Sequence, residues 1–159
     1  MKTTLLLVIG LLTVAACQQK EKANDSSKPV ALSFNNFVIG TPADTIQYRL
    51  RFGPTRTEGD KMKYDDVTFE TVRGNVEYKV PGGRLVGARF TNFQQDTAVY
   101  TVIYKRFVAK FGQPTYVKKR TAAWETEKDA LYLDGAVGAA VFYDVKDTPE
   151  PMYSRIKDL

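Results

Sequence analysis

The chain has 159 residues, a formal net charge of +5, one cysteine and no histidine. A single cysteine excludes an internal disulfide, and the lack of histidine excludes Ser-His and Cys-His nucleophile pairs as well as histidine zinc sites. The length suits one globular domain that can bury a core, and the charge surplus is too small to require a polyanionic partner.

The first seventeen residues have the three-part plan of a secretory signal. Lys2 gives a positive start, residues 5–12 are an apolar run, and small residues precede Cys17. The apolar run is too short for a stable transmembrane helix. We therefore expect a signal peptide over residues 1–16.

The run Val14-Ala15-Ala16-Cys17 resembles the lipobox of bacterial lipoproteins. The resemblance implies cleavage before Cys17, with diacylglycerol on its sulfur and an acyl chain such as palmitate on its new amino terminus. Two or more chains anchor a protein stably in a bilayer. Gln18 stands where an aspartate would resemble an inner-membrane retention signal, so the resemblance implies the outer membrane of the cell envelope, facing the periplasm. An ordinary secretory signal, with Cys17 there by chance, is the alternative.

The sequence predicts three further segments. Residues 17–32 are polar and lack hydrophobic periodicity, which is typical of a disordered tether. Its reach is on the order of 20 Å. A single domain over residues 33–147 follows, and the proline-punctuated residues 148–159 are expected to be a loose tail.

Four short motifs of the first half of this domain return in the same order in the second half. The pairs are Phe34–Phe37 with Phe90–Phe93, Arg51–Thr55 with Lys110–Thr115, Phe69–Thr71 with Trp124–Thr126, and Val86–Ala88 with Val137–Ala139. An ordered series of matches predicts an internal repeat of two units, about 34–90 and 90–147, although coincidence remains the alternative.

Each unit begins with a helical pattern. In the first, Thr41 is the expected N-cap and Gly53-Pro54 the stop, with a stripe of Ile46, Leu50, Tyr48 and Phe52. In the second, Asp96 is the expected cap and Gly112 the stop, with a stripe of Val99, Ile103, Phe107 and Phe111. A strand is the competing prediction for residues 98–104, which are rich in β-branched and aromatic residues.

Alternating patterns follow each helix. They predict strands at 67–71, 76–80, 85–90, 116–119, 122–126, 130–134 and 137–144, with a hairpin turn at 73–76. The predicted fold class is α+β: two tandem helix-plus-antiparallel-meander units that form one sheet with the helices on one face.

Two such units behind a lipobox resemble the fold of β-lactamase inhibitor proteins and of the small SmpA/BamE-type lipoproteins. The opening Gly40-Thr41-Pro42-Ala43-Asp44 is similar to the Gly-Met-Thr helix start of the SmpA/BamE type. The resemblance implies the fold, and no residue role is carried over.

The sheet face opposite the helices is a candidate binding surface. If Trp124 faces the helices, as Phe69 does in the first unit, the other face carries Glu70, Lys79, Arg89, Glu125, Tyr132 and Phe142. Tyrosine and arginine are typical interface anchors, although ordinary exposure of an antiparallel sheet gives a similar pattern. A slip of one residue would invert the assignment.

A run of cations without an acid is the second candidate, a basic patch for anionic lipid, glycan or an acidic partner. Its members are Lys105, Arg106, Lys110, Lys118, Lys119 and Arg120. Export argues against nucleic acid as the partner.

The inventory of side chains predicts a protein that is not an enzyme and needs no cofactor or metal. We expect a membrane-anchored lipoprotein that binds another envelope protein, as an assembly accessory or an inhibitor. Binding of anionic lipid or glycan is the alternative, and a hydrolase that uses only carboxylates such as Asp66, Glu125 and Glu127 is the third possibility.

Overall fold

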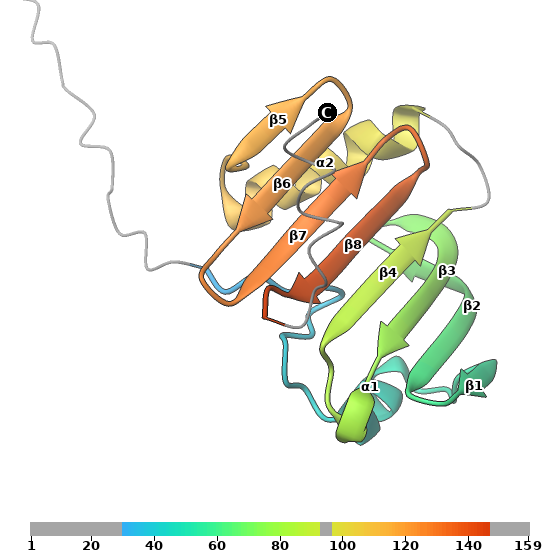
Figure 1. The fold of residues 1–159 in the computed structure, drawn as a ribbon. Coiled ribbons are helices and arrows are strands. Elements are labelled where there is room, and N and C mark those ends of the chain that lie inside the picture. The colour runs from blue at the N-terminus through green and yellow to red at the C-terminus, as the bar shows by residue number, and fades with distance from the viewer. Residues whose placement is uncertain (1–29, 93–96, 147–159) are drawn as a thin grey trace, which may run out of the picture.

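The computed structural model describes residues 30–92 and 97–146 (Figure 1). The signal peptide, Cys17, residues 17–29 of the tether and the tail at 148–159 lie outside these residues. The elements, in chain order, are α1 (Ala43–Leu50), β1 (Arg56–Glu58), β2 (Lys61–Phe69), β3 (Val72–Lys79), η1 (Pro81–Gly83), β4 (Gly87–Thr91), α2 (Thr97–Phe111), β5 (Tyr116–Lys118), β6 (Thr121–Glu125), β7 (Asp129–Asp134) and β8 (Ala139–Asp144). Neither described helix has the length and apolar character needed to cross a membrane.

All eight strands form one antiparallel sheet in the order β1-β2-β3-β4-β8-β7-β6-β5. The centre of the sheet is the ladder between β4 and β8, which runs from the pair Gly87 and Tyr143 to the pair Thr91 and Ala139. The two edges, β1 and β5, have three residues each. The first four strands and the last four are therefore joined into one sheet by hydrogen bonds between strands that are distant in sequence.

The core lies on the inner face of the sheet, the face toward α2. Alternate residues of each long strand point there because the side-chain period of a strand is two. The fully buried aromatic rings of this face are Tyr64, Phe69, Tyr78, Phe90 and Phe142. From α2, Ile103 and Phe107 reach the same core, as the predicted stripe requires. The competing prediction of a strand at 98–104 is wrong, since these residues are helical.

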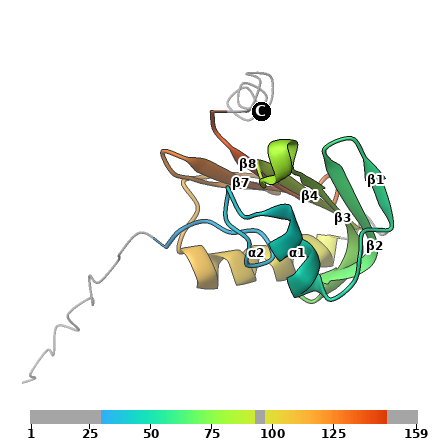
Figure 2. The same cartoon turned by 90° about the horizontal axis from the view of Figure 1, so that it is seen from below.

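An irregular segment fills the middle of the inner face. Phe34 and Phe37 exchange backbone hydrogen bonds of 2.8 and 2.9 Å around Asn35 and Asn36, which both have positive φ. This tight turn drives Phe34 into the core, where its ring centroid lies 4.4 Å from that of Phe69. Leu32, at the end of the predicted tether, is also buried. Figure 2 shows this segment in the layer beneath the sheet, beside α2.

The predicted fold class is wrong. The structure has a single eight-stranded sheet with two short helices, not two helix-and-meander units with a helical layer on one face. The physical reason is that α1 has eight residues and buries only Ile46, so it shields little of the sheet. Much of the inner face is covered instead by the irregular residues 32–37.

Two local predictions also differ from the structure. The residue that caps α1 is Pro42, while the Thr41 hydroxyl donates to the Val38 carbonyl at 2.7 Å. Between β2 and β3 the chain turns at Glu70 and Thr71, not at 73–76. Gly74 belongs to β3, where it pairs with Val67, and the Thr91 carbonyl oxygen and the Phe90 ring leave no room for a side chain at this position.

Candidate functional site

The outer face of the sheet, which points away from α2, carries two rows of side chains in register. One row runs across the sheet through Lys79, Gly87, Tyr143, Ala130 and Glu125. The next row runs through Glu77, Arg89, Val141, Tyr132 and Ala123. Four of the six predicted partner-binding residues therefore point to this face.

Arg89 and Tyr132 are the two of these four that lie near each other. Both are in the same row, with Val141 of β8 between them. Two strand spacings separate their backbones by about 10 Å. By contrast, Lys79 and Glu125 stand at opposite ends of their row, about 19 Å apart across four strand spacings.

The remaining two predicted residues lie elsewhere. Phe142 is fully buried on the inner face, and its ring lies 6.4 Å from that of Phe34. Glu70 is in the turn after β2, with φ 47°. In β8, whose sequence is Ala-Ala-Val-Phe-Tyr-Asp, both faces are apolar, so hydrophobic alternation could not show which residues face inward.

Around Arg89 the outer face is charged. Arg89 lies opposite Glu77, and with Lys63 and Asp65 they line a hollow of about 230 Å³. Glu77 also forms ion pairs with Lys61, at 3.4 Å, and with Lys63, at 3.9 Å. Exposed pairs of this kind contribute at most about 1 kcal/mol each, so they set the charge pattern more than the stability.

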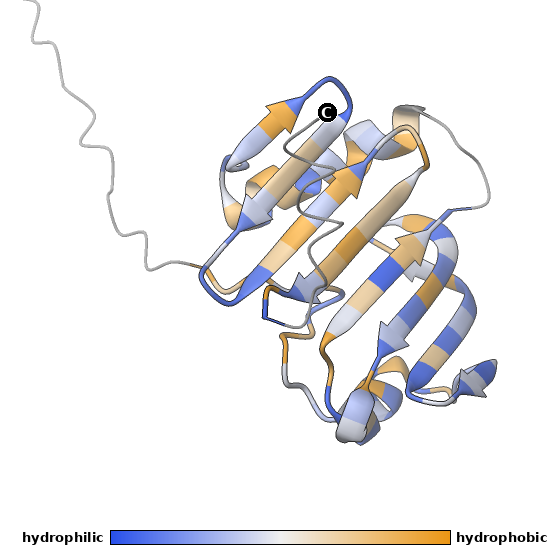
Figure 3. Ribbon diagram, in the orientation of Figure 1, coloured by the Kyte–Doolittle hydropathy of each residue, from blue (hydrophilic) through white to orange (hydrophobic). Residues whose placement is uncertain are grey.

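The side chains next to Tyr132 are mostly apolar, and Figure 3 colours much of β7 and β8 as hydrophobic. Its neighbours Ala123, Ala130 and Ala139 are buried, and Tyr143 is 8% exposed. Burial raises the pKa of the Tyr132 phenol, a hydrogen bond with Thr121 lowers it, and the nearby Asp134 carboxylate raises it again. The hydroxyl of Tyr132 is therefore protonated at neutral pH and can donate a hydrogen bond to a partner.

The structure divides the predicted basic patch into three places. Lys105 and Arg106 are exposed on α2, and Lys110 donates to the Asn36 side chain at 2.8 Å. Lys118, Lys119 and Arg120 lie at the β5–β6 turn. These last three line a hollow of about 460 Å³ together with Tyr116, Thr121, Asp134 and Ala136.

Asp66 and Glu125 are too far apart to act as an acid–base pair. Asp66 of β2 is bound by Arg73, while Glu125 stands on β6, five strand spacings or about 24 Å away. Glycosidase-type carboxylate pairs are about 5 to 10 Å apart. Within residues 30–92 and 97–146, no group of three or more acidic, cysteine or histidine side chains could hold a metal.

The exposed end of α1 is a surface that the sequence prediction missed. The predicted stripe placed Tyr48 and Phe52 with Ile46, but Tyr48 is 84% and Phe52 50% exposed. A signal was present in the spacing, since residues two apart in a helix point to opposite sides. Tyr48 is two positions from the buried Ile46 and therefore faces solvent.

In comparisons with known proteins, no family model matches the sequence, no curated protein matches it, and no solved structure matches the fold.

Proposed function

We propose that this protein is a bacterial lipoprotein, anchored through Cys17 to the outer membrane, and that it acts as a non-enzymatic binding module for another envelope protein. The observation that carries the proposal is the row Arg89, Val141 and Tyr132 on the outer face. It presents a cation, an apolar side chain and a phenol side by side. The helices α1 and α2 and the segment before α1 lie on the other side of the sheet (Figures 1 and 2).

The chemistry of this row fits protein recognition. Arginine and tyrosine dominate interface energetics because each combines a large contact area with hydrogen-bond donors. The β sheet holds the two side chains about 10 Å apart on a backbone that needs no rearrangement on binding. The partly exposed Val141 and Tyr132, with the exposed Arg89 beside them, suit a partner with an apolar centre and an acidic margin.

A capture experiment tests the binding proposal. The mature chain from residue 17, with Cys17→Ser and a tag, is incubated with detergent-solubilised envelope, beside Tyr132→Ala and Arg89→Ala. We expect one stoichiometric protein to be captured by the parent and lost from both variants. Tyr48→Ala, which removes an exposed tyrosine elsewhere, is the matched control and should retain it. Capture that is absent at low salt, or unchanged in both sheet variants, would refute the proposal.

The anchor is tested separately by metabolic labelling with palmitate. The full-length chain should take up label and sediment with membranes, whereas Cys17→Ser should lose both properties. Label retained by Cys17→Ser would place the acyl group elsewhere, and no label on the parent would favour an ordinary secretory signal.

A second candidate function is the binding of an anionic lipid or glycan at the β5–β6 turn. Three cations there share one hollow with Tyr116, whose ring can contact a sugar or an acyl-glycerol unit. Asp134 in the same hollow opposes an anion, which is why this candidate ranks second.

A further inference from the structure

The C-terminal end of α1 carries an unusual concentration of exposed aromatic rings. Tyr48 and Phe52 are the only aromatic side chains in residues 30–92 and 97–146 that are classed as exposed, at 84% and 50%. Every other described aromatic ring is buried or half-buried. Exposed aromatic groups that gather at one place mark a site of interaction more often than scattered ones do.

Two arginines accompany these rings. Arg49 and Arg51 are exposed and line a hollow of about 720 Å³ with Gln47, Tyr48, Phe52 and Gly53, and none of the described residues that line it is acidic. Neither guanidinium forms an ion pair with any described residue. Arg49 also borders a neighbouring hollow that contains Val38, which is 44% exposed. The α1 surface is defined here as Val38, Tyr48, Arg49, Arg51 and Phe52.

The α1 surface is held in place by the domain beneath it. The Phe52 ring meets the buried Tyr64 edge-on, with centroids 5.7 Å apart. The Arg51 N–H donates to the carbonyls of Gln47 and Tyr48 at 3.1 and 3.2 Å, which fixes the last turn of the helix. The exposed groups therefore need little reordering on binding.

The chemistry of the α1 surface matches the headgroup layer of a bilayer. Aromatic rings are favoured at the boundary between acyl chains and water, and a guanidinium binds phosphate through two parallel hydrogen bonds. The carbonyls at the end of α1 repel an anion, so the two arginines must supply the attraction. The acidic side chains of a protein partner would pair with the arginines, but they would offer no apolar contact to Tyr48, Phe52 and Val38.

We infer that the α1 surface docks on a membrane that contains anionic phospholipids, with Arg49 and Arg51 on headgroup phosphates and Tyr48 and Phe52 at the interface. The inference rests on the proposed anchor, because an acylated Cys17 would hold the domain next to the bilayer. Contact through this surface would orient the domain relative to the membrane.

Vesicle sedimentation tests the inference with the unacylated mature chain, Cys17→Ser from residue 17. Vesicles of phosphatidylcholine alone are compared with vesicles that contain phosphatidylglycerol, at low and high salt. We expect binding only to the anionic vesicles, weakened by salt. Arg49→Gln with Arg51→Gln should lower the affinity about 25-fold, at about fivefold per arginine. Tyr48→Ala with Phe52→Ala should lower the affinity by a factor that does not depend on the salt concentration.

Lys128→Gln with Lys146→Gln removes the same charge from exposed positions outside both candidate surfaces and is the matched control, expected to bind as the parent does. Lys118→Gln with Lys119→Gln tests the β5–β6 hollow separately. Equal losses in the α1 and control variants would overturn the inference in favour of general attraction, and a loss in Lys118→Gln with Lys119→Gln alone would overturn it in favour of the β5–β6 hollow. Absence of vesicle binding would also overturn it. If the α1 variants instead lose a captured envelope protein and keep vesicle binding, the α1 surface is a protein interface. These readouts use neither palmitate labelling nor capture by the sheet face, so this inference and the proposed function can fail independently.

Discussion

The two halves of the single sheet have different outer faces. The first half is β1 to β4 and the second is β5 to β8. The outer side of β2 and β3 is charged, with Lys61, Lys63 and Glu77 in ion pairs, whereas residues 130–133 of β7 and 139–143 of β8 are apolar or aromatic on both sides and aspartates stand at the strand ends. One sheet therefore has a charged, solvated face in one half and a mostly apolar face in the other.

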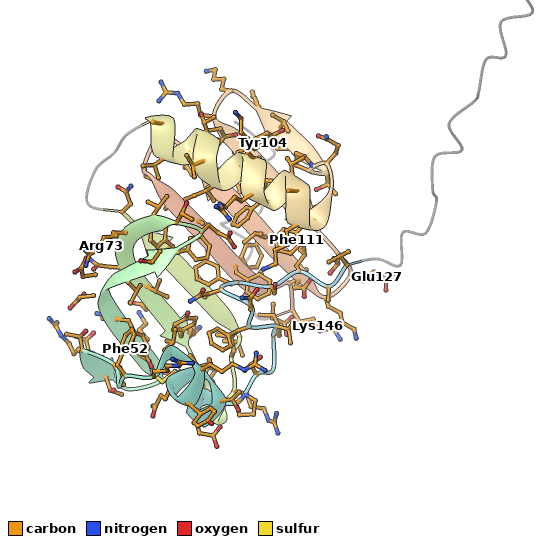
Figure 4. The ribbon with its side chains drawn as sticks, turned by 180° about the vertical axis from the view of Figure 1, so that it is seen from behind. Phe52, Arg73, Tyr104, Phe111, Glu127 and Lys146 are labelled. Carbon is orange, nitrogen blue, oxygen red and sulfur yellow. The ribbon has the colours of Figure 1, made fainter. Side chains whose placement is uncertain are left out.

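The two helices also differ in how much aromatic surface they bury. The last aromatic residue of the 15-residue α2, Phe111, is partly buried, whereas Phe52, two residues after the 8-residue α1, is 50% exposed. Figure 4 shows Phe52 at the margin of the domain beside β1, and Phe111 nearer the core. The helix that contributes less to the core thus presents more of its aromatic surface to the outside.

The largest expected effect comes from Phe107, which connects the halves. Its ring lies 6.0 Å from that of Phe69 and 5.4 Å from that of Trp124, and it is 1% exposed. Phe107→Ala should lower the free energy of unfolding by about 3–5 kcal/mol, measured by urea denaturation. Val102→Ala, on the exposed side of α2, should change it by less than about 0.5 kcal/mol. A loss below about 1.5 kcal/mol for Phe107→Ala would mean that the halves do not depend on this contact.

A glycine in each half gives the next comparison. A Cβ on Gly74 would collide with the Thr91 carbonyl oxygen and stand 2.6 Å from the Phe90 ring, while one on Gly135 would stand 2.8 Å from the Tyr100 ring and 2.9 Å from the Arg120 Cβ. The Thr91 oxygen belongs to a strand within the sheet, whereas Arg120 lies in the β5–β6 turn, which can shift more easily. Gly74→Ala should therefore cost about 2–3 kcal/mol and Gly135→Ala about 1 kcal/mol, by thermal or urea denaturation. Equal costs would show that β3 shifts as easily as the β5–β6 turn.

Alkaline pH should destabilise the fold, with the largest share coming from Tyr78 in the first half. Burial raises the pKa of Tyr78 far above its ordinary value and also raises the pKa of Tyr64. In the unfolded chain these phenols ionise near pH 10, so stability is complete below that pH and falls as the pH rises through the range between the unfolded and folded pKa values. The slope should reach about 1.4 kcal/mol per pH unit for each tyrosine, measured by urea denaturation between pH 9 and 12. In Tyr78→Phe the slope should be shallower, and an unchanged slope would contradict this assignment.

The smallest effect is expected at the helix ends. Arg51 ends α1 with φ 63°, and after α2 the left-handed position is Gly112, with φ 83°. A side chain in this conformation is strained, so Arg51→Gly should raise the free energy of unfolding by up to about 0.5–1 kcal/mol, while Gly112→Ala should lower it by about 1 kcal/mol. If Arg51→Gly is destabilising, the arginine makes a contact that outweighs the strain.

The sequence predicted the buried residues best in helices and strands where the apolar residues lie on one face only. The α2 stripe placed Ile103 and Phe107 in the core, and the alternation of Val76 and Tyr78 placed them on the inner face. It failed where the pattern was ambiguous. β8 is apolar on both sides, which misplaced Phe142, and Gly74 has the composition of a turn although its missing side chain makes room for Phe90.

The candidate binding surface was predictable only in part. The faces of Arg89 and Tyr132 follow from strand alternation, whereas their common row depends on the pairing of β4 with β8 and of β8 with β7. Register between strands distant in sequence is not encoded in a local pattern. The division of the basic run among α2 and the β5–β6 turn likewise depends on where α2 ends relative to the sheet.

The central ladder between β4 and β8 also bears on the order of folding. Every other ladder in the sheet joins strands that follow one another along the chain, so those hairpins close short loops. The β4–β8 ladder must close a loop of roughly 50 residues, which makes it the slowest to form. Until it forms, β4 and β8 are each an open edge with unpaired backbone groups, the kind of edge at which chains aggregate. The strands at the middle of the finished sheet are thus the ones most in need of protection while the protein folds.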